Sequence, residues 1–270
     1  MKLNNGFIIA EAGINHNGKL KTALDLVDVA KDNGANAIKF QTYKAEKRIN
    51  KKYRKIFNIL KKCELNSTDF KKISDYCKKR KITFFSTPFD LEAVDLLETL
   101  KVPAYKVASF DISNYELIKK ISKTNKKVIV STGMANEKEI INVYNFFKKK
   151  KIDLTLLHCV SSYPTKEADS YLSNIRYLIK KFNCKIGLSD HTNDIKIPIY
   201  GSILGATVIE KHLMIDQNHK CVDAPVSITG KQLKKLRTEI DDLKIILKKH
   251  KFGIKNPEKG AKIFKRKKIY

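Results

Sequence analysis

The chain has 270 residues, of which 42% are hydrophobic and 31% are charged. This length can bury the full core of one large α/β domain. Its 55 lysines and arginines outnumber its 28 aspartates and glutamates, which gives a formal net charge of +27. Only six of the basic residues are arginines, the side chain that nucleic-acid-binding proteins favour for paired contacts with phosphate and guanine. We therefore interpret the lysines as solvated helix faces and expect no nucleic-acid partner, although their field favours small anionic substrates.

Cysteine content and hydropathy indicate the cellular compartment of the protein. No apolar run approaches the roughly 18 residues of a membrane span, and the start of the chain does not resemble a signal peptide. The five cysteines contain no CxxC pair, which is typical of a protein in a reducing environment. We expect a cytoplasmic protein that has no membrane partner.

Short apolar runs recur along the chain and predict eight strands, at residues 7–10, 37–40, 82–85, 104–108, 128–130, 154–157, 185–188 and 207–209. Amphipathic stretches with a period near 3.6 separate most of them, among them 20–30, 92–100, 115–121 and 137–147. Strands that alternate with helices indicate a parallel sheet. Eight such units predict a closed (β/α)8 TIM barrel of the α/β class. We assign residues 1–255 to this barrel and residues 256–270 to a basic C-terminal tail.

One connection is longer than the others. Residues 43–66 contain a short amphipathic segment at 54–62, and Ser67, Thr68 and Asp69 then form an N-cap cluster for the next helix. A long loop after a barrel strand lies over the mouth of the barrel. The connection is therefore a candidate lid or dimer contact.

Polar side chains lie at or near the carboxyl end of every predicted strand. Because the carboxyl ends of barrel strands converge on one mouth, we expect these side chains to lie together. Burying an unpaired lysine or glutamate is costly, so a shared site explains them better than separate solvated ends. The set is Glu11, Lys39, Gln41, Ser86, Thr87, Lys106, Ser109, Ser131, Thr132, His158, Ser189, Asp190, His191, Glu210, Lys211 and His212.

The types of these side chains predict a reaction. His191 and His212 end consecutive strands and can hold one divalent metal with open coordination positions, although each could instead cap its strand. Lys39 and Lys106, together with serine hydroxyls, suit a phosphorylated anion. Glu11 and Asp223 are available for hydroxyl binding or proton transfer. A phosphate-bearing anion, an aldehyde and a Lewis acid together favour carbon–carbon bond formation.

Segments in these regions resemble the sialic acid (N-acetylneuraminate) synthase family, in the order found there. They extend through the predicted barrel and are 9–18 (IAEAGINHNG), 37–42 (AIKFQT), 85–89 (FSTPF), 105–109 (YKVAS), 131–134 (STGM), 158–164 (HCVSSYP), 187–192 (GLSDHT) and 208–212 (VIEKH). The family condenses phosphoenolpyruvate with an open-chain N-acyl hexosamine, such as one resembling N-acetylmannosamine, to give a nine-carbon sugar acid and phosphate.

The resemblance implies roles for individual residues. It implies a manganese-type divalent ion at His191 and His212, with Mg²⁺ and Co²⁺ as alternatives. It implies phosphoenolpyruvate binding by Lys39, Lys106, Ser109, Ser131 and Ser189. It implies catalytic roles for Glu11, Asp111 and Asp223, and contacts with the acceptor sugar for Gln41, Ser161 and Tyr163.

The chain also departs from the family pattern. Family members commonly continue into a small antifreeze-like domain, which we expect this chain to lack, since residues 256–270 resemble only the start of the linker to it. A homodimer, or a separate antifreeze-like polypeptide, is the protein partner that the resemblance suggests. Ser161 stands where sialic acid synthases can have asparagine, and segments 108–111, 131–135 and 222–227 favour the pseudaminic and legionaminic acid synthase branch. Two alternatives remain: a non-catalytic or partner-dependent barrel subunit, and a related barrel synthase that acts on a phosphorylated sugar.

Overall fold

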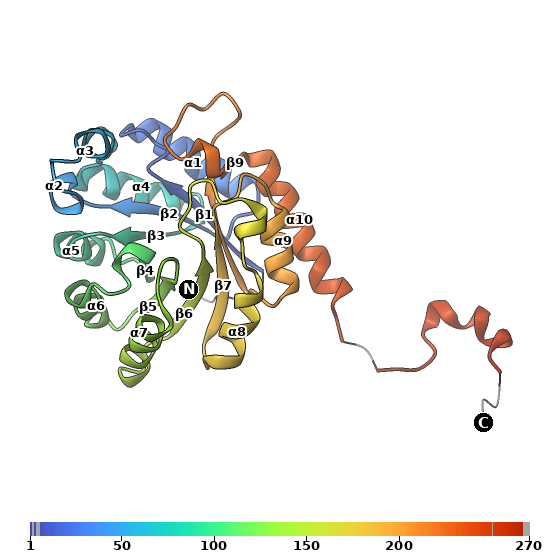
Figure 1. Cartoon of the computed structure of the whole chain (residues 1–270). Helices are drawn as coiled ribbons and strands as arrows, with labels where there is room; N and C mark the ends of the chain where they lie inside the picture. The colour runs from blue at the N-terminus through green and yellow to red at the C-terminus, as the bar shows by residue number, and fades with distance from the viewer. Residues whose placement is uncertain (2, 4–5, 250, 267–270) are drawn as a thin grey trace.

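Strand β1 pairs in parallel with both β2 and β8, and this pairing closes an eight-stranded barrel. The structure is a computed structural model that describes residues 1, 3, 6–249 and 251–266. The predicted (β/α)8 TIM barrel is confirmed. Figure 1 shows the ring of strands with helices around it. The strands are β1 (Phe7–Gly13), β2 (Ala37–Thr42), β3 (Thr83–Pro88), β4 (Ala104–Val107), β5 (Lys127–Ser131), β6 (Leu154–Cys159), β7 (Lys185–Asp190) and β8 (Val208–Leu213), with β9 (Ser227–Ile228) added beside β8.

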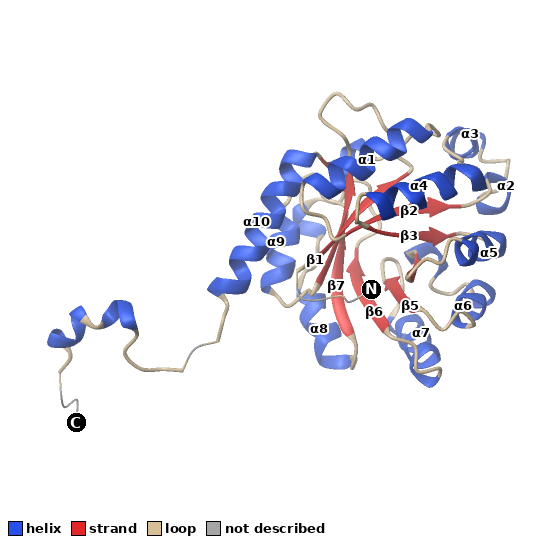
Figure 2. Cartoon of the chain, turned by 180° about the vertical axis from the view of Figure 1, so that it is seen from behind, coloured by secondary structure: helices blue, strands red, loops and turns tan. Residues whose placement is uncertain are grey.

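The helices cover the outside of the barrel, as Figure 2 shows from behind. Each turns an apolar stripe toward the strands. In α1 this stripe is Ala23, Leu26, Val27 and Ala30, at the spacing of one helix face. The helices of the ring are α1 (Leu20–Asp32), α4 (Ser67–Lys79), α5 (Leu91–Thr99), α6 (Tyr115–Ser122), α7 (Glu137–Lys149), α8 (Ser173–Lys181), α9 (Lys196–Ile203) and α10 (Gly230–Ile246).

The long connection after β2 carries two further helices, α2 (Ala45–Arg48) and α3 (Arg54–Lys62). It has a small core of its own, in which the Tyr43 hydroxyl donates to the Leu60 carbonyl oxygen at 2.9 Å. The predicted N-cap of the next helix was misplaced by one residue. Asn66 caps α4 and forms a capping box with Asp69, because its amide oxygen accepts from the Asp69 N–H at 2.9 Å.

Shorter 3₁₀ helices complete the structure: η1 (Ser109–Asp111), η2 (Glu167–Asp169), η3 (Ala224–Val226), η4 (Asn256–Glu258) and η5 (Gly260–Phe264). The last two belong to a segment that extends away from the barrel in Figure 1. The boundary at residue 255 stays a prediction, and residues 267–270 of the predicted tail lie outside the described residues. Within the described ranges, no helix has both the length and the apolarity to span a bilayer.

Candidate active site

A cavity of about 460 Å³ opens at the carboxyl ends of the barrel strands. Most of the site residues predicted from the sequence line it, and they come from elements along the whole chain. They are Glu11, Lys39, Gln41, Lys106, Ser109, Ser131, Tyr163, Ser189, His191, His212 and Asp223. The convergence expected of a barrel mouth is therefore observed.

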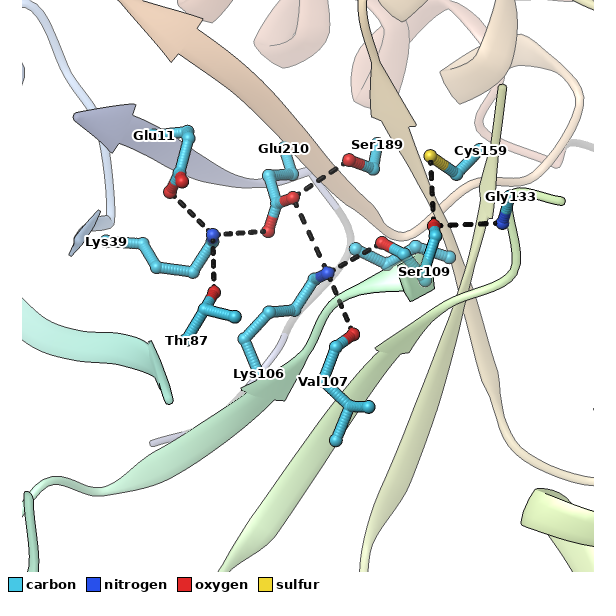
Figure 3. Close-up of polar contacts among 12 residues, drawn as sticks. Glu11, Lys39, Thr87, Lys106, Val107, Ser109, Gly133, Cys159, Ser189 and Glu210 are labelled. Carbon is cyan, nitrogen blue, oxygen red and sulfur yellow. Dashed lines mark hydrogen bonds and ion pairs between the residues drawn. The ribbon is translucent and has the colours of Figure 1, made fainter. Parts of the chain in front are cut away.

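Two lysines and two glutamates meet at the bottom of the cavity, where Figure 3 shows their contacts. We call Glu11, Lys39, Lys106 and Glu210 the lysine–glutamate cluster. Lys39 Nζ lies 2.6 Å from Glu11 Oε2 and 3.6 Å from Glu210 Oε2. Lys106 Nζ lies 3.8 Å from Glu210 Oε1. All four side chains are buried, so each charge depends on the others for stabilisation.

Hydroxyl groups surround this cluster. Lys39 Nζ donates to Thr87 Oγ1 at 3.0 Å, and Lys106 Nζ donates to Ser131 Oγ at 2.7 Å. Ser189 Oγ donates to Glu210 Oε1 at 2.8 Å. Strand register explains these contacts, because Ser189 lies opposite Glu210 on the next strand. Glu11 likewise lies opposite Lys39 on one side and opposite His212 on the other.

Two basic and two acidic side chains make up the cluster, so their formal charges cancel. Burial tends to raise the pKa of Glu210, but Lys106 and Lys39 outweigh burial and hold this pKa at about 2. Burial also tends to lower the pKa of Lys39, but Glu11 and Glu210 raise it above its usual value. For Lys106 burial prevails, and its pKa is lowered. Because the formal charges of the two lysines and the two glutamates cancel, a multiply charged anion needs further positive charge nearby.

The two histidines face each other beside the cluster, with ring centroids 5.4 Å apart. His191 Nδ1 lies 2.8 Å from the Val160 carbonyl oxygen, a contact in which Nδ1 is the donor because a carbonyl oxygen can only accept. His212 Nδ1 is buried, has no hydrogen-bond partner among the described residues, and lies 3.4 Å from Asp223 Oδ2. The Tyr163 ring stacks on His191 at a centroid distance of 4.1 Å.

A buried ion pair supports the strand ends that carry these histidines. Lys211 Nζ lies 2.6 Å from Asp190 Oδ2, which also accepts from Thr192 Oγ1 at 2.7 Å. The pair joins β7 to β8 immediately before His191 and His212. Within the described ranges, no group of three or more histidine, cysteine or acidic side chains is arranged to hold a metal.

Asp223 reaches the cavity from the loop after β8. Its backbone N–H donates to Asn15 Oδ1 at 2.9 Å, and the Asn15 amide donates to the Leu213 carbonyl oxygen and to Ser227 Oγ. Burial tends to raise the pKa of Asp223, but His212 and then Arg48 lower it below its usual value. The carboxylate therefore stays ionised opposite the histidines.

Two predicted residues lie apart from the cavity lining. Asp111 accepts from Asn114 Nδ2 at 2.9 Å, and burial raises its pKa. Ser161 lines an adjoining cavity beyond Cys159. Cys159, which the sequence analysis did not include in the site, has its Sγ 3.6 Å from Ser109 Oγ and 3.9 Å from His191 Nδ1, at the wall between the two cavities.

Sequence reasoning missed two charged residues of the site. Glu210 was among the polar strand ends but received no role, although both lysines contact it. Arg48, the last residue of α2, lines the cavity at its rim. No periodic pattern marks Arg48, because it lies in the irregular connection after β2.

Comparisons with known proteins agree with this geometry. The NeuB family matches residues 26–252. The chain is 41% identical to the N,N'-diacetyllegionaminic acid synthase of Campylobacter jejuni, over 86% of this chain and 75% of that protein. It is 36% identical to the pseudaminic acid synthase of the same species, over 84% and 71%. A crystal structure of an N-acetylneuraminic acid synthetase from Leptospira borgpetersenii, in complex with citrate, is 39% identical and has a TM-score of 0.92, covering 97% of this chain and 92% of that one. The chain therefore belongs to the NeuB family and is an enzyme of the sialic acid synthase type.

Proposed function

We propose that the enzyme condenses phosphoenolpyruvate with the open-chain aldehyde of an N-acyl hexosamine, giving a nine-carbon sialic-acid-type sugar acid and inorganic phosphate. The observation that carries this proposal is the pair of buried lysine side chains, Lys39 and Lys106, in one cavity with His191, His212 and Asp223. The names of its relatives, a legionaminic and a pseudaminic acid synthase, support the product class.

Phosphoenolpyruvate would occupy the bottom of the cavity. Lys39 and Lys106 bring two amino groups there, and Ser109, Ser131 and Ser189 bring hydroxyl groups. The Gly133 N–H donates to Ser109 Oγ at 3.0 Å, which fixes the position of that oxygen. Charge-assisted hydrogen bonds in a buried site are the strongest means of holding phosphate and carboxylate groups.

The histidine pair fits a divalent cation, for which Mn²⁺ is our first choice. His212 Nδ1 is a buried nitrogen that lacks a hydrogen-bond partner in the part of the chain that the structure describes. The Val160 carbonyl oxygen orients His191, as is common for metal-binding histidines. A cation would also supply the positive charge that the neutral lysine–glutamate cluster lacks. When bound, it provides a Lewis acid for a carbonyl oxygen.

The acceptor sugar would lie nearer the rim. Gln41 and Tyr163 line that part of the cavity and offer hydrogen bonds to sugar hydroxyls. Glu11 and Asp223 are the carboxylates placed to bind hydroxyls or to move protons during the reaction. Ser161 and Asp111 lie outside the lining, so we assign them at most indirect contacts with the acceptor.

The bond changes balance without a redox partner. The enol carbon of phosphoenolpyruvate attacks the aldehyde carbon, and the aldehyde oxygen gains a proton. Water then adds to the carbon that bears the phosphate ester, and the C–O bond to phosphate breaks. The products are a 2-keto sugar acid and inorganic phosphate.

Turnover with labelled substrate tests the proposal. The protein is incubated with Mn²⁺, phosphoenolpyruvate carrying ¹⁸O in the bridging position, and a panel of N-acyl hexosamines. We expect phosphate release that depends on the sugar, with the label in the phosphate, and a product mass of a nonulosonic acid.

Lys106→Met is expected to lose turnover, whereas Lys231→Met, at an exposed position of α10, serves as the matched control. Absence of turnover with every sugar, despite bound metal, would contradict the proposal and favour the non-catalytic alternative.

The panel also includes the 6-phosphates of the same sugars. One relative, from Drosophila melanogaster, is named an N-acetylneuraminate-9-phosphate synthase and is 30% identical over 88% of this chain. A clear preference for phosphorylated acceptors would replace the free sugar in our proposal with its phosphate.

A further inference from the structure

Arg48 is held rigidly at the rim of the cavity. Its guanidinium carbon lies 3.8 Å from the centroid of the Phe89 ring and 4.6 Å from that of Tyr43. Its Nη1 donates to Gln41 Oε1 at 2.8 Å. A planar cation that stacks on aromatic rings and donates one hydrogen bond has little freedom to turn.

Most of the donors of this guanidinium are available to a ligand. The side chain carries five N–H donors, and within the described residues its one hydrogen bond is to Gln41. The neighbouring carboxylates Asp111 and Asp223 act on Arg48 through space without forming an ion pair with it. A cation placed this way, with unused donors at a cavity, is suited to an uncharged or anionic oxygen atom of a substrate.

Gln41 separates Arg48 from the phosphoenolpyruvate end of the cavity. Gln41 Nε2 donates to Glu11 Oε1 at 3.3 Å, and Glu11 in turn contacts Lys39. Arg48 is therefore the outer member of a chain that leads from the rim to the lysine–glutamate cluster. The ligand atom that Arg48 meets belongs to whichever substrate lies nearer the rim, which in our proposed function is the acceptor sugar.

The wall beside Arg48 is apolar. Ile56, Ile59 and Leu60 of α3 line the cavity together with Phe89 and Phe110. Ile56 and Ile59 are 51% and 43% exposed, so they have unfilled contact surface. A hydrogen-bond donor next to an apolar wall suits a ligand group that has a carbonyl oxygen beside a methyl group. A hydroxyl group could accept the hydrogen bond, but it has no methyl group to cover the apolar wall.

We propose that Arg48 is a specificity-determining residue that donates hydrogen bonds to the acyl carbonyl oxygen of an acetamido group on the acceptor, while Ile56 and Ile59 contact the acyl methyl. This inference rests on the proposed function. It names the residues that would distinguish an N-acyl sugar from a plain hexose. Lysine cannot replace Arg48, because an ammonium group lacks the plane that stacks on Phe89.

A substrate pair tests this role. The N-acyl hexosamine that the wild type converts fastest is compared with the parent hexose, which has a hydroxyl in place of the acetamido group; if the hexose is not converted, its inhibition constant is measured instead. We expect Arg48→Ala to lower kcat/KM for the N-acyl sugar by about 10- to 100-fold, since hydrogen bonds to charged groups have this range of strength. The KM for phosphoenolpyruvate should change less than threefold. The kcat/KM of the hexose, or its inhibition constant, should also change less than threefold. Arg48→Lys should remain impaired.

Arg54 supplies the matched control, because it is an exposed arginine at the start of α3 that does not line the cavity. Arg54→Ala should leave both sugars unaffected. An equal loss for both sugars in Arg48→Ala, or a parallel rise in the KM for phosphoenolpyruvate, would overturn the role of Arg48 and leave the proposed function intact. A wild type that converts no sugar would instead contradict the proposed function, and the role of Arg48 with it.

Discussion

The Asn15 side-chain oxygen accepts a hydrogen bond from the Asp223 backbone N–H at 2.9 Å, joining residues 208 positions apart. Asn15 is fully buried, and its amide also donates to the Leu213 carbonyl oxygen and to Ser227 Oγ. One side chain after β1 therefore holds both ends of the loop that brings Asp223 to the cavity.

The first prediction concerns this loop. Asn15→Ala removes three hydrogen bonds made by one buried side chain, so we expect a loss of unfolding free energy of about 2 kcal/mol or more. Asp223 should become mobile, which raises the KM for the acceptor sugar and leaves that for phosphoenolpyruvate unchanged. Chemical denaturation and steady-state kinetics measure these effects. Asn17→Ala is the control, since Asn17 donates to the same loop at the exposed Lys220 carbonyl oxygen; equal effects of the two variants would contradict the positioning role.

The second prediction concerns the pH dependence of phosphoenolpyruvate binding. Glu210 raises the pKa of Lys106, whose pKa burial lowers. Glu210→Gln removes that carboxylate, so the pKa of Lys106 should fall further and its ammonium form should be lost at a lower pH. The alkaline limb of kcat/KM for phosphoenolpyruvate should therefore move down by about one pH unit or more. The exposed Glu92 forms an ion pair with Lys47 outside the cavity, and Glu92→Gln should leave the profile in place. If the alkaline limb of Glu210→Gln stays where it is in the wild type, Glu210 does not control the pKa of Lys106.

The third prediction concerns stability and His16. This histidine is 1% exposed, and burial lowers its pKa from 6.5 to about 4. Between these pH values the His16 imidazole is protonated in the unfolded chain but not in the folded protein, so the free energy of unfolding rises with pH in this window. We expect the free energy of unfolding to fall by about 2 kcal/mol from pH 7 to pH 5 because of His16. Urea titrations at both pH values measure it. His16→Gln cannot titrate, and a drop of the same size in that variant would assign the effect to other groups.

The fourth prediction concerns the cation. Electron paramagnetic resonance of free Mn²⁺ measures binding without any need for activity. His191→Ala and His212→Ala should each weaken binding by more than about 100-fold, because loss of a direct ligand costs more than loss of a group that only orients one. His219→Ala is the control, since His219 lies outside the cavity lining and accepts from the Ile215 N–H. Unchanged binding in both ligand variants would support the alternative in which each histidine only caps its strand.

The barrel and most of its site were predictable from local patterns. Each strand contains a run of apolar residues, and most helices show a 3.6-residue period, so both are determined by neighbours in the sequence. Because parallel strands in a barrel place their carboxyl ends at one mouth, the polar residue after each strand could be assigned to the site before any contact was known. His191, His212, Lys39 and Lys106 were identified in this way.

Contacts between distant segments were decided by the tertiary structure alone. Glu210 acquires its position only when β8 closes against β1, which sets it between two lysines from β2 and β4. Arg48 acquires its position because an irregular connection stacks it on Phe89 from the end of β3. Hydrophobic periodicity reports which face of an element is buried, whereas the partner of a buried charge depends on chain closure and loop packing, which no local pattern encodes.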